Sequence, residues 1–241
     1  MNKICKLNFD SKLANANIGK IIIDDESFDP AVVKRLMKRF DLVYVLSKRG
    51  PELVWSFCGF DWVFAGIKIN LHLKLRSIVF PKIILSSKDF FKLSDKRELI
   101  LLAQDLFKQS RFQQDSHTHR LGKKINTQWM KNSMLGSAAD DILVSRDLKG
   151  SVIGFITVKK QNGFFEPVLI KVSDRYQGVG KGKNLMYKFF NYVATKNPQG
   201  FLTVNTMLHN TKALNFYHSF GFKVHDYQHV YHIYPKGFKK F

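Results

Sequence analysis

A glycine-rich segment between a predicted strand and a predicted helix has the residues needed to bind phosphate. The apolar run Pro167–Val172 predicts the strand, and the helix is expected to begin at Lys181, with Gly178 and Gly180 between the two. Glycines allow backbone N–H groups to approach a phosphate closely, because no side chain holds it away. The positive end of the helix adds favourable charge at the same place. The segment therefore predicts a phosphate cradle, although a plain strand–turn–helix connection can carry the same short pattern.

Two common phosphate-binding patterns do not match this segment. A P-loop, GxxxxGK[ST], needs a second glycine five residues after the first, but Lys183 occupies that position after Gly178. A dinucleotide-binding fingerprint needs an acidic residue about 20 positions after its glycines. The chain reads Thr195-Lys196-Asn197-Pro198 there, so both patterns are excluded.

The order Gln177-Gly178-Val179-Gly180-Lys181-Gly182 fits Q/R-x-x-G-x-G/A and resembles the acyl-CoA-binding motif of the GNAT acetyltransferases. A second stretch, Asn210–Tyr217 followed by Gly221-Phe222, is similar to another signature of that family. The resemblance covers about residues 95–235. It implies an α/β GNAT fold, in which helices flank a mixed, mostly antiparallel central sheet that contains two splayed parallel strands. It also implies acyl-CoA as the co-substrate.

The resemblance assigns expected roles to individual residues. CoA would bind where the parallel strands ending near Val172 and Asn205 splay apart. Backbone groups of Ile170 and Val172 would polarise the thioester carbonyl, and the amides from Gly178 to Lys183 would hold the pyrophosphate. The expected CoA-binding residues are Ile170, Val172, Gln177, Gly178, Val179, Gly180, Lys181, Gly182, Lys183, Asn210 and Tyr217.

Tyr217 stands where the family places its general acid, and a phenol can protonate a leaving thiolate. The alternative is a core position, because Ala213, Leu214 and Phe220 share its face of the predicted helix.

A narrower resemblance concerns the acceptor. Ser110-Arg111-Phe112 with the polar stretch after it, the helix at Thr127-Gln128-Trp129 and the start of the chain are similar to TDP-fucosamine acetyltransferase and its relatives. This likeness implies transfer of acetyl, or of a short hydroxyacyl group such as 3-hydroxybutanoyl, to the amine of a dTDP-linked amino-dideoxyhexose. The product would serve surface polysaccharide biosynthesis (O-antigen, lipopolysaccharide or capsule).

Candidate acceptor-side residues lie in the polar stretch Ser110–Lys124. Arg111, Phe112 and Asp115 are expected to contact the substrate, with the guanidinium suited to phosphate oxygens. Asp115 and His117 are hypothetical general bases, and each also fits a solvated polar residue. Glu166 on the CoA strand is a further acidic group without a motif match. His117 and His119 form an H-x-H pair with no third ligand, so we expect no metal.

Composition limits the competing functions. The formal net charge is +20, and its lysines are spread along the chain, which fits compositional bias or a field that attracts anionic ligands. A GNAT enzyme acting on a protein or another small-molecule amine is the first alternative, and a non-catalytic nucleic-acid-binding domain is the second. We expect no nucleic-acid partner. Cys5 and Cys58 form no disulfide framework or zinc ribbon.

The longest apolar stretch, Val54–Ile67, is interrupted by Asp61 and too short for a membrane helix, so we expect no membrane insertion. The N-terminus lacks an apolar signal region, which favours the cytoplasm. The resemblance is compatible with a homodimer through edge strands near the C-terminus.

The elements that must position these residues divide the chain into a smaller N-terminal α/β domain, residues 1–92, and a GNAT catalytic domain, residues 93–241. Within the first, Asp29-Pro30 predicts a helix start. Within the second, we expect helices at Ser86–Gln109, Ile125–Leu135, Lys181–Thr195 and Thr211–Phe220, and strands at Ile142–Arg146, Val152–Lys159, Pro167–Val172, Phe201–Asn205, Phe222–Tyr227 and His229–Tyr234.

Overall fold

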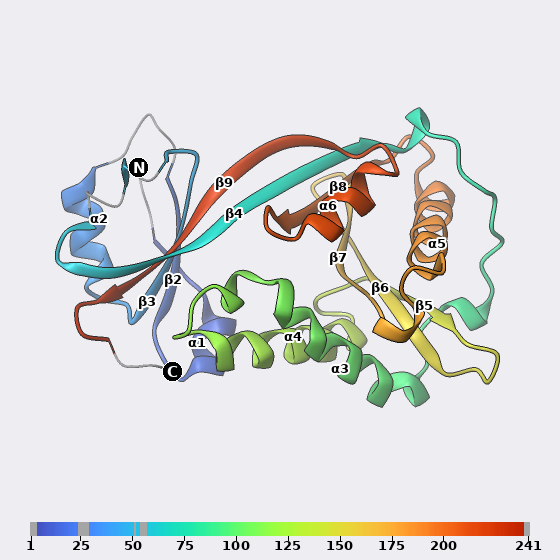
Figure 1. Cartoon of the computed structure of the whole chain (residues 1–241), viewed down its shortest axis with the longest axis horizontal. Coiled ribbons are helices and arrows are strands. Elements are labelled where there is room, and N and C mark those ends of the chain that lie inside the picture. The colour runs from blue at the N-terminus through green and yellow to red at the C-terminus, as the bar shows by residue number, and fades with distance from the viewer. Residues whose placement is uncertain (1–3, 24–28, 51, 54–56, 239–241) are drawn as a thin grey trace.

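One mixed sheet runs through the part of the chain that the computed structural model describes, namely residues 4–23, 29–50, 52–53 and 57–238. Helices cover both faces of this sheet (Figure 1). Its described strands lie in the order β1-β2-β3-β9-β4-β8-β7-β6-β5. They span Cys5–Lys6 (β1), Ile18–Ile23 (β2), Leu42–Ser47 (β3), Phe60–Lys74 (β4), Asp141–Arg146 (β5), Val152–Gln161 (β6), Phe164–Val172 (β7), Phe201–Met207 (β8) and Lys223–Pro235 (β9). The predicted fold class is confirmed.

The α-helices are Asn8–Ala14 (α1), Pro30–Met37 (α2), Lys96–Gln104 (α3), His119–Met134 (α4), Lys181–Lys196 (α5) and Thr211–His218 (α6). Helix α2 begins at the predicted Asp29-Pro30, where the Ala31 amide donates to the Asp29 carboxylate at 2.9 Å. Proline suits a first helical position because its missing N–H would have no partner there.

Strands β4 and β9 form a long antiparallel pair that joins the two ends of the sheet (Figure 1). β4 also pairs with β8, and β9 also pairs with β3. The predicted break between two C-terminal strands is wrong, because Gln228 continues the ladder opposite Lys68. Strands from both sides of the predicted boundary at residues 92 and 93 therefore belong to one sheet. The division into two domains there stays a prediction.

Two helix predictions differ from the structure at their N-terminal ends. Residues 86–95 form the short 3-10 helices η3 (Ser87–Asp89) and η4 (Leu93–Asp95), because Asp89 and Asp95 accept the amides of Ser86 and Lys92 and close each turn locally. Helix α3 begins only after them. Helix α4 starts at His119, so the end of the expected polar loop is helical.

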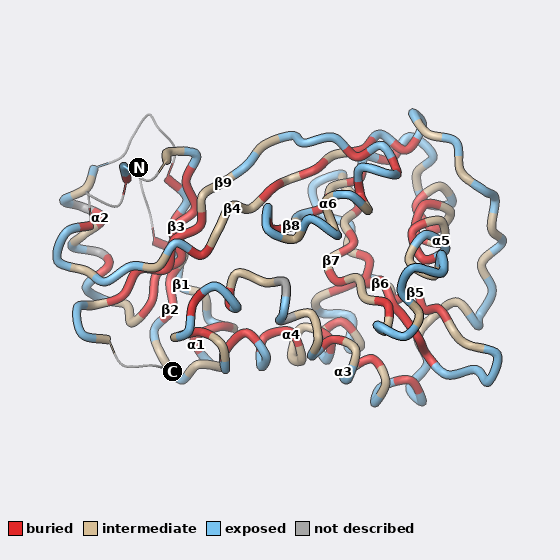
Figure 2. The backbone as a smooth tube through the Cα atoms, viewed as in Figure 1, coloured by how far each residue is buried: buried red, intermediate tan, exposed pale blue. Residues whose placement is uncertain are grey.

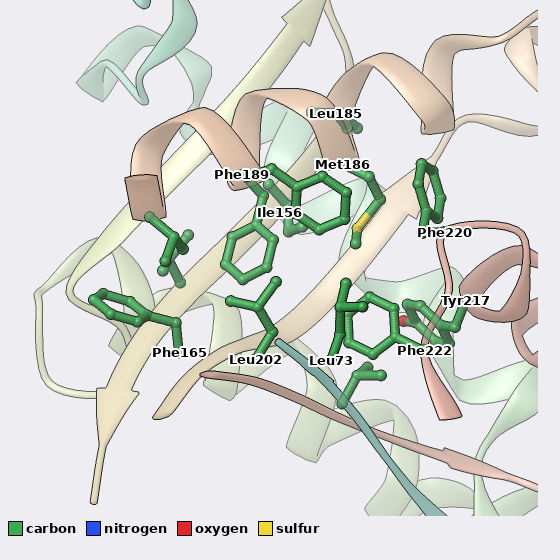
Figure 3. Packing of buried hydrophobic residues seen from close by; sticks show 14 of the residues in the cluster. Leu73, Ile156, Phe165, Leu185, Met186, Phe189, Leu202, Tyr217, Phe220 and Phe222 are labelled. Carbon is green, nitrogen blue, oxygen red and sulfur yellow. The ribbon is translucent and has the colours of Figure 1, made fainter. Parts of the chain in front are cut away.

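The largest core cluster lies between helices α5 and α6 and the adjoining strands (Figure 3). Helix α5 buries one face, which carries Leu185, Met186, Phe189, Phe190 and Val193. Figure 2 shows buried residues in most of the strands and along the helices, whereas the first half of β9 is exposed or intermediate. This packing holds the start of α5 beside α6, where the two sequence motifs lie.

Within the described residues, no helix is long and apolar enough to cross a membrane. The apolar stretch 54–67 begins with three residues outside that description and enters strand β4 at Phe60.

Candidate active site

The glycine segment between β7 and α5 has a backbone that only glycine adopts readily. Gly178 and Gly180 have φ angles of +79° and +80°, in the left-handed region. A Cβ atom at either position would meet nothing within 4 Å. Backbone conformation, and not lack of space, therefore explains these two glycines.

Gln177 connects the glycine segment to the end of β7 and the first turn of α6 through side-chain hydrogen bonds. Its Nε2 donates to the carbonyl oxygen of Val172 at 3.0 Å and to Asp174 Oδ1 at 2.7 Å. Its Oε1 accepts from Lys212 Nζ, on the first turn of α6, at 3.4 Å. A Cβ on Gly182 would lie 3.3 Å from the ring of Phe216, so the first turn of α5 packs closely on α6.

The other residues predicted to bind CoA surround this segment. Val179 is 67% exposed, and Lys181 and Lys183 lie in the first turn of α5. Val172 ends β7, with Ile170 two residues before it. Asn210 caps α6, since its Oδ1 accepts from the Ala213 amide at 3.2 Å. The structure brings these residues to one end of the sheet, and their contacts with CoA stay a prediction.

Strands β7 and β8 diverge after a short parallel pairing. Only Phe164 and Phe165 of β7 are paired, with Phe201 and Leu202 of β8. Beyond them, a single side-chain hydrogen bond crosses between the strands, from Asn205 Nδ2 to Glu166 Oε1, at 2.6 Å. Strands β7 and β8 therefore splay apart as predicted, and Glu166 follows directly after the last paired residue of β7.

Glu166 has a pKa above its ordinary value. Burial raises the pKa of its carboxyl group, while the hydrogen bond from Asn205 and the charge of Lys68 act in the opposite direction. A carboxylate with a raised pKa accepts a proton more readily at neutral pH. Sequence reasoning left this residue without a role, although it is the only acidic residue in the strand that enters the glycine segment.

Tyr217 lies in the core, and its role as general acid stays a prediction. It is 4% exposed and packs edge-on against Phe222, with ring centroids 5.7 Å apart (Figure 3). Burial raises the pKa of its phenol, and the negative charge of Glu166 raises it further. The phenol therefore stays protonated at neutral pH and lies within the field of Glu166. A core position and a proton-donating role are compatible here.

Asp115 is 1% exposed and lies at the centre of a buried hydrogen-bond network. Its carboxylate accepts from His232 Nδ1 at 2.6 Å, from the Tyr234 hydroxyl and from the His117 amide at 2.9 Å. Burial acts to raise its pKa, but the hydrogen bonds from His232 and Tyr234 outweigh it and hold the pKa well below the ordinary value. Such a carboxylate is a weak base, so the roles predicted for it gain no support from this geometry.

His117 contacts the same network. Its Nδ1 lies 3.1 Å from Asp115 Oδ1, and its ring lies beside Tyr234, with centroids 5.0 Å apart. These contacts fix the turn before α4. Its predicted role as a base stays a prediction.

Arg111 stands on the 3-10 helix η6 (Arg111–Gln113), between two aromatic rings. Its guanidinium carbon lies 4.4 Å from the centroid of the Tyr44 ring and 4.7 Å from that of Phe112. Phe112 is 4% exposed and supports Arg111 from the core. Their predicted substrate contacts stay predictions. Among the described residues, no three His, Cys, Asp or Glu side chains are grouped as metal ligands would be.

Comparisons with known proteins agree with this architecture. The family model for the acetyltransferase (GNAT) domain matches residues 108–232, more than half of the chain. A curated relative, the spore coat polysaccharide biosynthesis protein SpsD of Bacillus subtilis, is 28% identical over 142 residues. That match covers 58% of this chain and 48% of SpsD, so the chain matches about half the length of that relative.

Two solved structures share the fold over nearly the whole chain. A conserved protein of unknown function from Staphylococcus epidermidis superposes with a TM-score of 0.60 at 12% identity, covering 96% of this chain and 90% of that one. A GCN5-related N-acetyltransferase from Kribbella flavida superposes with a TM-score of 0.57 at 12% identity, covering 92% of this chain and 82% of that one. The family match shows that the chain belongs to the GNAT acetyltransferases, and the two solved structures share its fold.

Proposed function

We propose that this enzyme transfers an acetyl or short hydroxyacyl group from acyl-CoA to the amine of a dTDP-linked amino-dideoxyhexose. The observation that carries the chemical part is the position of Glu166, half-buried where β7 and β8 separate and close enough to Tyr217 to raise its pKa. In this proposal the reaction takes place in the cytoplasm and supplies surface polysaccharide synthesis.

The donor binds through the segment between β7 and α5. The pyrophosphate lies against the amides from Gly178 to Lys183, with Lys181 and Lys183 adding positive charge. Backbone groups of Ile170 and Val172 align the pantetheine and donate to the thioester oxygen as negative charge develops there. Gln177 keeps this segment in place through its contacts with Val172 and Lys212.

Two residues move protons at the divergence of β7 and β8. The acceptor reaches the enzyme largely as an ammonium ion, and Glu166 takes one of its protons, directly or through a water molecule. The neutral amine then attacks the thioester carbon, and the C–S bond breaks as the tetrahedral intermediate collapses. Tyr217 donates its phenolic proton to the leaving sulfur and recovers one from the acylated amine. The raised pKa of Glu166 suits proton uptake, and the raised pKa of Tyr217 keeps its phenol protonated until the thiolate leaves.

The sugar acceptor is supported by two observations. SpsD is named for spore coat polysaccharide biosynthesis, and it shares 28% identity with this chain over 142 residues. In addition, Lys68 acts on Glu166, and Lys20 and Arg111 act on Lys68, so positive charge on this side suits an acceptor that carries negative charge.

Release of free CoA from acetyl-CoA, followed with a thiol reagent, tests this function. dTDP-linked 4-amino- and 3-amino-6-deoxyhexoses are offered separately, then again with 3-hydroxybutanoyl-CoA, and each product is weighed by mass spectrometry. We expect turnover with one of these sugars and a mass increase of one acyl group. Binding of acetyl-CoA without turnover on any sugar would contradict the sugar acceptor and favour a protein or another small-molecule amine.

A further inference from the structure

Three cations share one face of the sheet although they lie far apart in the sequence. Lys20 pairs with Tyr44 across β2 and β3, and Tyr44 pairs with His232 across β3 and β9. Directly paired residues point to the same face of a sheet. Lys68 pairs with Gln228, four residues before His232 on β9, so the period of two places it on that face as well. Arg111 covers the face from η6, over the ring of Tyr44.

These cations lack carboxylate partners at contact distance. Among the described residues, no ion pair joins Lys20, Lys68 or Arg111 to an acidic side chain, whereas Lys159 and Lys188 each have one. Both lysines have lowered pKa values: burial lowers each, and the charge of Arg111 lowers each further. Lys20 also lowers the pKa of Lys68. The three charges are therefore close enough to repel one another.

Acidic groups lie near this face but form no ion pair with its cations among the described residues. Asp10 and Glu166 both have pKa values raised by burial, and Arg111 and Lys68 respectively lower them in part. Asp226 accepts a hydrogen bond from the Asn70 side chain. None of the three touches a cation of this group at ion-pair distance among the described residues. An additional anion would relieve the repulsion between the cations.

Buried polar atoms without hydrogen bonds occur at the same place. Within the described part of the chain, Arg111 Nε and His232 Nε2 are buried and have no hydrogen-bond partner, whereas the Tyr44 hydroxyl faces Asp10 and Arg111. The rings of Tyr44 and His232 lie 4.9 Å apart, and Arg111 lies over Tyr44. Buried polar groups without partners are uncommon, and a bound ligand is one established explanation.

We propose that Lys20, Lys68 and Arg111 bind the phosphate or diphosphate group of the acceptor. This inference rests on the proposed function, because it places the acceptor's amine at Glu166. The same face continues to that residue: Asn70, two residues from Lys68, pairs with Asn205, which donates to Glu166.

The spacing suits one sugar ring. Lys68 pairs with Met207, and Asn205 lies two residues further along β8. One strand spacing and two residues of rise give about 8 Å between the Cα atoms of Lys68 and Asn205. A hexose with its anomeric phosphate spans a comparable distance. The enzyme therefore recognises an acceptor with an amine at one end and phosphate at the other.

Isothermal titration with dTDP tests the site directly, on protein saturated with CoA so that the pyrophosphate site of the donor is filled. We expect dTDP to bind the wild type and to bind about ten- to a hundredfold more weakly to Lys20→Gln and Lys68→Gln, as for loss of a charge-assisted hydrogen bond. Lys20→Arg keeps the charge and should retain most of the affinity. Lys149→Gln, in an exposed turn, is the matched control and should bind normally.

A second titration with glucosamine 6-phosphate distinguishes a sugar phosphate from a nucleoside diphosphate as the source of the anion. Binding of either probe that depends on Lys20 and Lys68 supports the site. Absence of binding by both, or binding that the two variants leave unchanged, overturns it. Turnover only with amino sugars that lack a phosphate group would also overturn the site, while leaving the proposed acyl transfer intact. Absence of turnover with every amine would instead contradict the proposed function.

Discussion

The donor side and the proposed acceptor side of this enzyme are assembled differently. Most residues assigned to acyl-CoA lie in one stretch, from Ile170 to Lys183, and act largely through the backbone. The proposed acceptor side takes single side chains from β2, β4 and η6. The two sides meet at Glu166 and Tyr217. This difference explains how one fold can keep its donor while individual substitutions change its acceptor.

Because the donor and acceptor sides meet at Tyr217, we expect a substitution of this residue to have the largest effect on activity. We expect Tyr217→Phe to lower kcat by about 10²- to 10⁴-fold, since the leaving sulfur loses its proton donor. The ring still fills its place against Phe222, so the melting temperature should change little. Free-CoA release at saturating substrates measures kcat. Full turnover in this variant would show that Tyr217 serves only the core.

Glu166 should have the next largest effect. We expect Glu166→Gln, which can keep a hydrogen bond to Asn205, to lower kcat by about 10²-fold at neutral pH. In the wild type, kcat/KM should fall as acid protonates Glu166, and its raised pKa moves this limb above the ordinary range of a glutamate. The variant should lose this limb. A pH–rate profile with the same acid limb in both proteins would contradict the assignment.

Asp115 is expected to affect stability more than chemistry. Asp115→Asn should lower the free energy of unfolding by about 3 kcal/mol, because His232 and Tyr234 lose a charged hydrogen-bond partner in the core. Urea unfolding measures this change. Asp140→Asn, which removes a half-exposed pair with Lys159, is the control and should cost less than about 1 kcal/mol.

The same residue predicts a pH dependence of stability. The pKa of Asp115 is lowered in the folded state, so its contribution is present above the unfolded pKa, about 4, and is lost as pH falls below it. Below about pH 4, the wild type should lose stability more steeply than Asp115→Asn. A kcat reduced a hundredfold in folded Asp115→Asn would instead restore its predicted role as a base.

Gly180→Ala should have the smallest effect, and we expect that effect on the donor side alone. A Cβ at φ +80° strains the backbone, and we expect a loss of about 1 kcal/mol together with a several-fold higher KM for acyl-CoA. Gly136, at φ +76° after α4, also has open space around it. Gly136→Ala should therefore lose similar stability without a change in KM. Equal KM values in the two variants would separate the glycine segment from CoA binding.

The sequence predicted the donor side because its signals are local. A strand, positive-φ glycines and a helix start follow one another within a few residues, and Asn210 and Tyr217 belong to a second short motif. Of the cations on the proposed acceptor side, only Arg111 was named from the sequence. Lys20, Tyr44 and His232 become neighbours only through the pairing of β2, β3 and β9, which the sequence does not specify.

The same reason explains two errors near the C-terminus and before α4. The ladder of β9 with β3 and β4 stabilises one long strand, where the local pattern around Gln228 predicted two. Asp115 is polar and stands in a polar stretch, which predicted an exposed position, but its buried partners come from β9. Partners that are distant in sequence decided both outcomes.

Separate KM values for donor and acceptor, measured in Gly180→Ala and Lys68→Gln, test most directly whether the two sides act independently. We predict that Gly180→Ala raises KM for acetyl-CoA and leaves that for the dTDP-linked amino sugar nearly unchanged. We predict the reverse for Lys68→Gln, with little change in kcat. Two variants that raise both KM values by the same factor would contradict a division into a donor side and an acceptor side.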